Sequence, residues 1–486
     1  MKNKLKLKNA LSYRFIALSL MLLTFASCSK DYLEEPDNTA GLTEDVVFSS
    51  RQVTESYIAG ILANYKGQYQ GSPDAGGIYS LDYARVVKGN DVIQGVSHYR
   101  FDYNHENREP NYRRTQFNWD FNYQNVNYAN ILIQGVSESA LSDVEKKEFI
   151  AIGKALRAYH HFQLLLDFVP NYANNKDVVR IPFYTERVSL ETVGGKAPSS
   201  ASDIMDQILL DINDAIADLP DSRIGKSYIN KRVAYGMKAR ILAVTKDDWA
   251  GMSEAAKMAY GGNAAAAVAS INWGNGFNNM EDDEWIWALY QNGTSETNYY
   301  WGHTAAFFDH FNLSYQAAYM NPNFVNEFSD TDVRNTFSDF YGVSASVPWR
   351  EFVSSKFVFG FDSDIVLMRN SEMVLYDAEA QYQLGNIPEA KNLLFALQSN
   401  RDPNAVMSAN VGTQLFEEIL LERRKEMYGE FGTEWFDAKR YNRAINRDAV
   451  HRTPVNVPAD SPLFYLKIPQ TEIDASEFYT DAINQE

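Results

Sequence analysis

Long runs of helical periodicity constrain the fold of this 486-residue chain more than any other feature. In residues 142–170 a Ser-Asp-Val-Glu capping box opens a run whose apolar residues recur every three or four positions, and a proline ends it. A similar run covers residues 200–220, and shorter helical patterns cover 52–65, 231–244 and 253–260. We expect these segments to form antiparallel helix pairs.

The segment 373–397 has a more specific pattern. It predicts one helix, a turn at Gly385-Asn, and a second helix that starts at Pro388, where proline suits the first turn. The spacing of Ala380, Gly385 and Ala390 resembles a tetratricopeptide unit, in which small residues let paired helices approach closely. No regular 34-residue repeat extends along the chain, so any further repeats are degenerate.

Two regions, 66–110 and 273–361, lack a steady period and are rich in aromatic residues, which predicts irregular loops. Ten of the 30 tyrosines lie between Tyr57 and Tyr128. A tyrosine packs with its ring and keeps a polar edge, which suits surfaces that stack on sugars or peptides. Since long loops within a compact domain are usually functional, we expect ligand contacts in these two regions.

The N-terminal residues 1–27 have the pattern of a secretory signal peptide, with five basic residues followed by the apolar run 15–25. This run is about half the length that a membrane-spanning helix needs. The only cysteine, Cys28, ends a Phe-Ala-Ser-Cys sequence that resembles a lipobox, so we expect its lipidation. Ser29-Lys-Asp31 resembles the signal that exports such lipoproteins to the outer face of the outer membrane.

The expected domain organisation follows from this pattern. Residues 28–43 are predicted to be a lipidated flexible tether, and 44–486 a single domain with an N-terminal part, 44–340, and a C-terminal part, 341–486. Removal of the signal peptide lowers the formal net charge from −18 to −23, because the five basic residues leave with it. No basic cluster survives to neutralise phosphates, which excludes nucleic acid as a partner.

The best acidic cluster is Glu281-Asp-Asp-Glu284. Asp282, Asp283 and Glu284 are weak candidates for calcium ligands, and such carboxylates also suit glycoside hydrolysis. An isolated run of this kind is more often a solvated loop. The sequence shows no other catalytic or metal-binding motif, so we expect no catalytic residues and no cofactor apart from calcium at this cluster.

Several segments together resemble the SusD/RagB family. They are Phe117–Val126, Lys154–Leu164, Arg369–Ala380, Ile419–Glu426, Trp435–Arg440 and Ile468–Ile473, in the family's order. Near the C-terminus the pairs Glu422–Lys425, Arg423–Glu426 and Asp437–Arg440 are spaced i to i+3, so we expect them to pair along solvated helix faces. Trp435 and Phe436 are expected to anchor this region in the core.

The resemblance implies an all-α fold, in which a tetratricopeptide-like helical scaffold packs under an irregular, loop-rich cap. It also implies a function, which is to capture a glycan at the cell surface and deliver it to a SusC-like, TonB-dependent outer-membrane transporter. The chain would then be lipid-anchored on the outer membrane and would not be an enzyme. Stacking of sugar faces on aromatic rings, with a few hydrogen bonds, would supply affinity.

Candidate ligand-binding residues lie in the two loop-rich regions. The stacking candidates are Tyr79, Tyr83, Tyr99, Tyr103, Trp273, Trp287, Tyr299 and Trp301, and the hydrogen-bonding candidates are Arg85, Asn90 and Asp91. Two alternatives stay open: a peptide-binding lid of a RagA-like peptide importer, and a surface glycosidase with two carboxylates across a cleft.

Overall fold

The computed structural model describes residues 44–67, 72, 74–95, 98–189, 194–269, 272–293, 298, 302–342 and 347–485. Within these ranges the chain is mostly helical, which confirms the predicted fold class. The longer helices are α3 (Arg51–Tyr65), α4 (Gly77–Val86), α6 (Arg113–Glu138), α7 (Asp143–Phe168), α8 (Ala201–Asp218), α9 (Lys231–Thr245), α10 (Trp249–Tyr260), α14 (Asn370–Gln383), α15 (Ile387–Arg401), α16 (Thr413–Met427) and α17 (Thr433–Arg440). The short helices are α2 (Glu44–Val47), α5 (Arg100–Tyr103), α11 (Ala264–Ala267), α12 (Thr304–Phe308), α13 (Pro322–Val325) and α18 (Gln470–Ala475).

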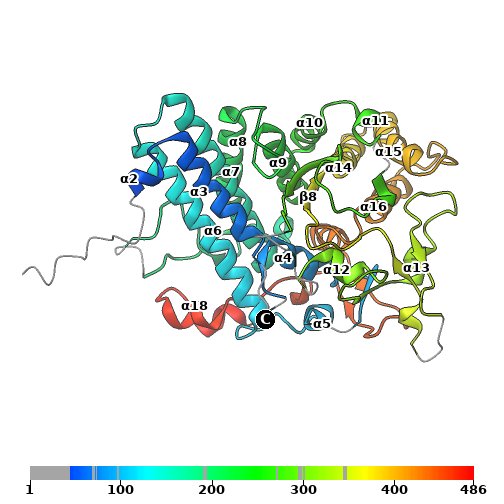
Figure 1. Ribbon diagram of the computed structural model, residues 1–486. Coiled ribbons are helices and arrows are strands. Elements are labelled where there is room, and N and C mark those ends of the chain that lie inside the picture. Colours follow the sequence, from blue (N-terminus) through cyan, green and yellow to red (C-terminus); the bar gives the residue numbers. More distant parts are fainter. Residues whose placement is uncertain are drawn as a thin grey trace, which may run out of the picture.

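Long helices that are neighbours in the sequence pack against one another, although short helices lie between α10 and α14. Helix α6 packs on α7, α7 on α8, α8 on α9, α9 on α10, α10 on α14 and α14 on α15. Figure 1 shows these helices side by side, with the short strands and irregular segments gathered below and to one side of them. This stacking of helix pairs is the tetratricopeptide-like scaffold that the sequence predicts.

The helix boundaries have the local causes that the sequence indicates. Ser142 and Glu145 form a complete capping box at the start of α7. The Ser200 hydroxyl accepts a hydrogen bond from the Asp203 backbone N–H at the start of α8. Gly385 follows the end of α14 and has φ +80°, a conformation that glycine adopts without strain. Pro388 lies in the first turn of α15.

Ten short strands form five two-stranded antiparallel sheets in the described residues. The strands are β1 (Val92–Gln94), β2 (Val179–Ile181), β3 (Ser199–Ser200), β4 (Trp285–Leu289), β5 (Ala318–Met320), β6 (Phe337–Ser338), β7 (Val353–Ser354), β8 (Ile365–Arg369), β9 (Ile445–Asn446) and β10 (Asn456–Val457). The pairs are β1–β5, β2–β3, β4–β8, β6–β7 and β9–β10. Each sheet therefore ties together two segments of the chain, and the β1–β5 pair joins the two aromatic regions of the sequence.

The prediction that residues 66–110 form only irregular loops is wrong in part. Helices α4 and α5 and strand β1 lie within this range. Nine of the ten residues of α4 are buried, so its sequence has no polar face from which a helical period could be recognised. The region 273–361 likewise contains four short strands, which the aromatic composition does not reveal.

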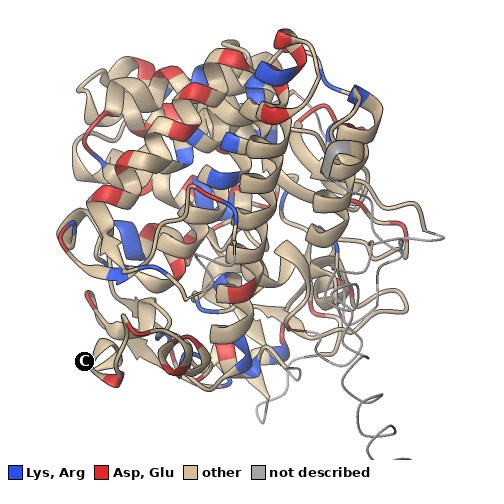
Figure 2. Cartoon of the chain, turned by 90° about the vertical axis from the view of Figure 1, so that its left-hand side faces the viewer, with Lys and Arg blue, Asp and Glu red and all other residues tan. Residues whose placement is uncertain are grey.

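The outer helical surface has mixed charge. Figure 2 shows acidic and basic residues interspersed along the helices of one face. Such alternation is typical of solvated helices rather than of a surface with a single sign of charge. In the part of the chain that the structure describes, no helix is both long and apolar enough to cross a membrane.

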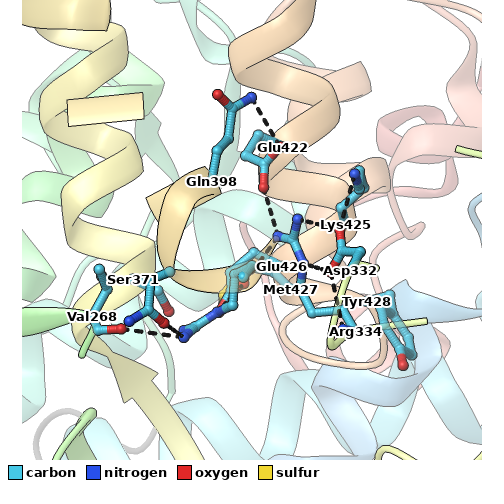
Figure 3. Close-up of polar contacts among 12 residues, drawn as sticks. Val268, Asp332, Arg334, Ser371, Gln398, Glu422, Lys425, Glu426, Met427 and Tyr428 are labelled. Carbon is cyan, nitrogen blue, oxygen red and sulfur yellow. Dashed lines mark hydrogen bonds and ion pairs between the residues drawn. The ribbon is translucent and has the colours of Figure 1, made fainter. Parts of the chain in front are cut away.

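A buried ionic network joins α16 to the segments around it (Figure 3). The carboxylate of Glu426 is fully buried and binds Arg369 at 2.8 Å, Arg401 at 3.0 Å and Arg334 at 3.1 Å. Arg334 also binds Glu422 at 2.6 Å. Since Arg334 lies just before β6, the network holds this surface segment against the scaffold.

The expectation of a solvated C-terminal charged face is therefore wrong. Glu422, Arg423 and Glu426 are buried and find partners on other elements, because the low dielectric of the interior requires each charge to be paired. Among the described residues, only Asp437 and Arg440 form the predicted i to i+3 pair, at 2.7 Å. Trp435 and Phe436 are buried as predicted, each with 1% of its surface exposed.

Candidate functional site

The structure corrects the choice of stacking residues. Six of the predicted rings are at most 2% exposed, namely Tyr79, Tyr83, Tyr99, Tyr103, Trp273 and Trp287. Tyr83, for example, stacks on Phe307 with ring centroids 4.4 Å apart. Rings that are covered on all sides by protein offer no face to a ligand, so these six residues are core residues. Tyr299 and Trp301 lie outside the described residues, as does Cys28.

Two of the three predicted hydrogen-bonding residues are engaged by the fold. Arg85 is buried and donates to Asp167 at 3.0 Å and to Gln163 at 2.7 Å. Asp91 accepts hydrogen bonds from Arg424. Because these charged groups are already paired inside the protein, they are not available to sugar hydroxyls.

The loop that contains Asn90 is held by hydrogen bonds with Glu434, Arg447 and Asn321, which we name the clasp. One carboxylate oxygen of Glu434 accepts from the backbone N–H groups of Asn90 at 2.5 Å and Asp91 at 3.0 Å. Arg447 donates to the carbonyl of Gly89 at 3.0 Å, and Asn321 to that of Asn90 at 3.0 Å. The backbone of Asn90 is therefore held in place by the fold, although the Asn90 side chain is partly exposed.

The clasp predicts a pH dependence of stability. Burial, and then the negative charge of Asp91, raise the pKa of Glu434 to about 7, although Arg424 and the two N–H groups oppose the shift. A carboxyl whose pKa is raised by folding stabilises the fold most below its unfolded pKa, and this contribution is lost as the pH rises towards 7. Between pH 5 and 8 we therefore expect the wild type to lose about 2 kcal/mol more unfolding free energy than Glu434→Gln.

Denaturant unfolding of both chains at the two pH values measures this difference. The glutamine of the Glu434→Gln variant keeps an oxygen that can accept from both N–H groups, but it has no charge to titrate. Equal pH dependence in the two chains would show that another group controls it.

The acidic cluster is also partly engaged. The carboxylate of Glu284 is buried and binds Arg401 at 2.7 Å and Arg369 at 3.3 Å, so it is not free to bind calcium. Asp282 accepts from the Glu284 backbone N–H at 2.9 Å. Within the described ranges, no group of three or more His, Cys, Asp or Glu residues is arranged to hold a metal ion.

A different set of aromatic residues is exposed on one surface, and we name it the aromatic patch. It consists of Phe311, Tyr319, Phe340, Tyr341 and Trp349, which form a chain of neighbouring rings with centroids 4.9–6.1 Å apart. Phe311, Phe340 and Tyr341 are 46–48% exposed, Trp349 is partly exposed, and Tyr319 lies beneath them. The rings of Phe311, Phe340 and Tyr341 are therefore presented to solvent as a connected surface, and the buried Tyr319 ring links them to Trp349.

The small sheets hold the aromatic patch in place. Tyr319 lies on β5, which pairs with β1, and Phe340 and Tyr341 follow β6, which pairs with β7. Trp349 lies in a 3-10 turn, Pro348–Arg350, just before β7. The buried Tyr319 ring therefore rests on paired strands, and the exposed rings of Phe340, Tyr341 and Trp349 lie in the short segments beside β6 and β7.

The Tyr341 ring is oriented by a buried histidine. Nε2 of His310 lies 2.8 Å from the carbonyl of Ala318, which can only accept, so Nε2 carries the proton. Burial lowers the pKa of His310, which keeps the ring neutral at pH 7. Nδ1 then accepts from the Tyr341 hydroxyl at 3.0 Å, and this bond fixes the exposed ring.

Two arginines lie beside Trp349. The guanidinium carbon of Arg350 is 4.7 Å from the Trp349 ring centroid, and that of Arg452 is 5.6 Å away. The Arg350 Nε–H is buried and has no hydrogen-bond partner among the described residues, and Arg452 donates to the carbonyl of Gly95. The patch thus has exposed ring faces with two partly exposed arginine side chains at its edge. Ring faces and polar groups are the two kinds of contact that a sugar ring makes.

Sequence reasoning missed this patch although it lies inside the predicted loop region. Phe340-Tyr341 follows Asp339 and precedes Gly342, and an aromatic pair between turn-forming residues is a signal for an exposed loop. The clustering of Tyr and Trp along the chain selects other residues as binding candidates. Clustering in sequence does not show which rings are exposed, because exposure depends on what packs over each ring.

The protein is thus a helical scaffold with an exposed aromatic surface on its loops. A family model described as starch-binding and associating with the outer membrane matches residues 31–242, and a model of the SusD family matches 253–480. The chain belongs to the SusD family, which confirms the resemblance seen in the sequence. No curated protein is significantly similar to it in sequence.

Solved structures share the fold over nearly the whole chain. A SusD-like carbohydrate binding protein from Bacteroides vulgatus has 21% identity and a TM-score of 0.79, with 90% of this chain and 99% of that chain covered. Surface glycan-binding protein A from Bacteroides thetaiotaomicron, in complex with laminarihexaose, has 16% identity and a TM-score of 0.68, with 88% and 98% covered. At these identities the likeness establishes the fold alone.

Proposed function

We propose that the chain is a cell-surface lipoprotein that captures an oligosaccharide or polysaccharide on the aromatic patch. The observation that carries the proposal is the connected surface of exposed rings at Phe311, Phe340 and Tyr341, with Arg350 and Trp349 beside it. Aromatic faces cover the apolar faces of sugar rings, and guanidinium groups donate to hydroxyls. The glycan-binding relatives of the same fold support this assignment of ligand class.

Delivery to a SusC-like, TonB-dependent transporter is the second part of the proposal. It rests on the family and on the N-terminal sequence, where Cys28 follows a signal peptide and would carry the lipid anchor on the outer membrane. In this role the protein releases its ligand unchanged. The patch contains rings and guanidinium groups, whereas glycoside hydrolysis requires two carboxyl groups across the scissile bond.

The proposal is tested with the soluble chain that begins at Ser29. We expect native gels that contain the correct polysaccharide to retard it, and Tyr341→Ala to weaken binding about tenfold in calorimetry, since one stacked ring contributes about 1.4 kcal/mol. Phe340→Ala is expected to have a similar effect, because its ring lies 4.9 Å from that of Tyr341.

Tyr112→Ala is the matched control, because Tyr112 is 44% exposed against 46% for Tyr341 and lies outside the patch. Its affinity should equal that of the wild type. Retention that neither Tyr341→Ala nor Phe340→Ala changes would remove the patch as the binding surface. Binding to peptides, with no retention by any glycan, would overturn the ligand class.

A further inference from the structure

A separate cavity lies between α6, α18 and the segment 182–188. Its volume is about 210 Å³, and Trp119, Tyr123, Tyr184, Glu186 and Glu472 are among the residues that line it. Figure 1 shows α18 and α13 on opposite sides of the molecule, and α13 directly follows β5 of the aromatic patch. The cavity is therefore distinct from the surface proposed to bind glycan.

Three aromatic rings form much of its wall. The rings of Trp119 and Tyr123 have centroids 4.7 Å apart, and those of Tyr123 and Tyr184 are 5.6 Å apart at 89°. The Tyr123 hydroxyl donates to the Pro182 carbonyl at 2.8 Å, so its ring is held in one orientation. The three rings thus line one small volume at different angles, and the faces of aromatic rings attract cations.

The charges that line the cavity are negative. Glu472 and Glu186 line it, and none of the described residues in its wall is Lys or Arg. The carboxylate of Glu472 is partly buried and forms no ion pair among the described residues. Burial raises its pKa, a hydrogen bond from Trp119 opposes this, and the nearby charge of Asp120 raises it further. A cation in the cavity would relieve the desolvation and repulsion that this carboxylate experiences.

We propose that this cavity binds the ammonium group of an amine-bearing ligand, with Glu472 as its counter-ion and Trp119, Tyr123 and Tyr184 as a cation–π cage. Typical small-molecule pockets begin at roughly 300 Å³, so the cavity suits one side chain or one sugar ring rather than an oligosaccharide. An ammonium group of this size has two sources, an amino sugar and a lysine side chain.

The experiment titrates the soluble chain with three probes at pH 7.5 and follows ligand resonances by saturation-transfer NMR. Glucosamine and Nα-acetyl-lysine amide carry an ammonium group, and N-acetylglucosamine is the neutral counterpart of the first. We expect at least one of the two amines to bind and the neutral sugar to bind at least tenfold more weakly. Which amine binds identifies the source of the ammonium group.

Glu472→Gln tests the counter-ion, because Gln keeps an acceptor for the Trp119 N–H but has no charge. It should weaken amine binding at least tenfold, whereas Glu477→Gln, at an exposed position further along the chain, should leave it unchanged. Tyr341→Ala in the aromatic patch should also leave it unchanged. The proposal is overturned if neither amine binds, if N-acetylglucosamine binds equally well, or if Glu472→Gln retains full affinity.

Discussion

Replacement of Glu426 by alanine is expected to lower the free energy of unfolding by about 3–5 kcal/mol. This carboxylate is fully buried and is shared by Arg334, Arg369 and Arg401. Without this carboxylate, three buried guanidinium groups lose a shared counter-charge, and the buried site has no solvent to replace it. Denaturant unfolding of the soluble chain at pH 7 measures the loss.

Glu417→Ala is the matched control on the same helix. Glu417 binds Arg443 at 2.7 Å, but the two side chains are 51% and 36% exposed, so solvent screens the pair. Such pairs contribute about 0–1 kcal/mol, and both substitutions change helix propensity equally. If Glu426→Ala destabilised the chain no more than Glu417→Ala, the network would not have the stabilising role assigned to it.

Replacement of Gly432 by alanine is expected to destabilise the fold by about 2–5 kcal/mol. Gly432 precedes α17 with φ +75°, a conformation in which a Cβ costs about 1–2 kcal/mol. That Cβ would also overlap the Arg85 side chain and lie 2.8 Å from the Arg85 carbonyl carbon and 3.0 Å from the Val86 nitrogen. Because backbone atoms of α4 are involved, relief requires the two helices to separate, which adds about 1–3 kcal/mol.

Gly385→Ala separates the two contributions. Gly385 has φ +80°, and no atom lies within 4 Å of where its Cβ would be, so only the backbone strain remains. Thermal and denaturant unfolding should show a loss of about 1–2 kcal/mol there and a clearly larger loss at Gly432. Equal losses would mean that α4 and α17 can move apart without penalty.

The scaffold was predictable from local signals. The capping box at Ser142, the Ser200 cap and the turn at Gly385 each act within a few residues, so the sequence shows them directly. Helix α4 was missed because it is buried on nearly all sides and therefore has no amphipathic period. Local chemistry thus predicts helices that have an amphipathic period or clear end signals. Helix α14 is also mostly buried, but Gly385 and Pro388 mark its end and the start of α15, whereas α4 has no such signals.

The candidate site was much less predictable. A tyrosine in a loop is exposed or buried according to segments far away in the chain, as Tyr83 shows by stacking on the distant Phe307. The same applies to the charges of α16, whose partners Arg334 and Arg369 lie on other elements. Composition predicted an aromatic surface, but only the packing identifies which rings form it.

The clasp on residues 89–91 also has a kinetic meaning. The hydrogen bond between Asn90 and Glu434 joins residues 344 positions apart, and that between Gly89 and Arg447 joins residues 358 apart. At about 5–20 residues per second, synthesis produces the first partner of these contacts about 20–70 s before the second. Contacts between residues so far apart in sequence form late in folding. The N-terminal half must therefore avoid aggregation until the C-terminal residues are present.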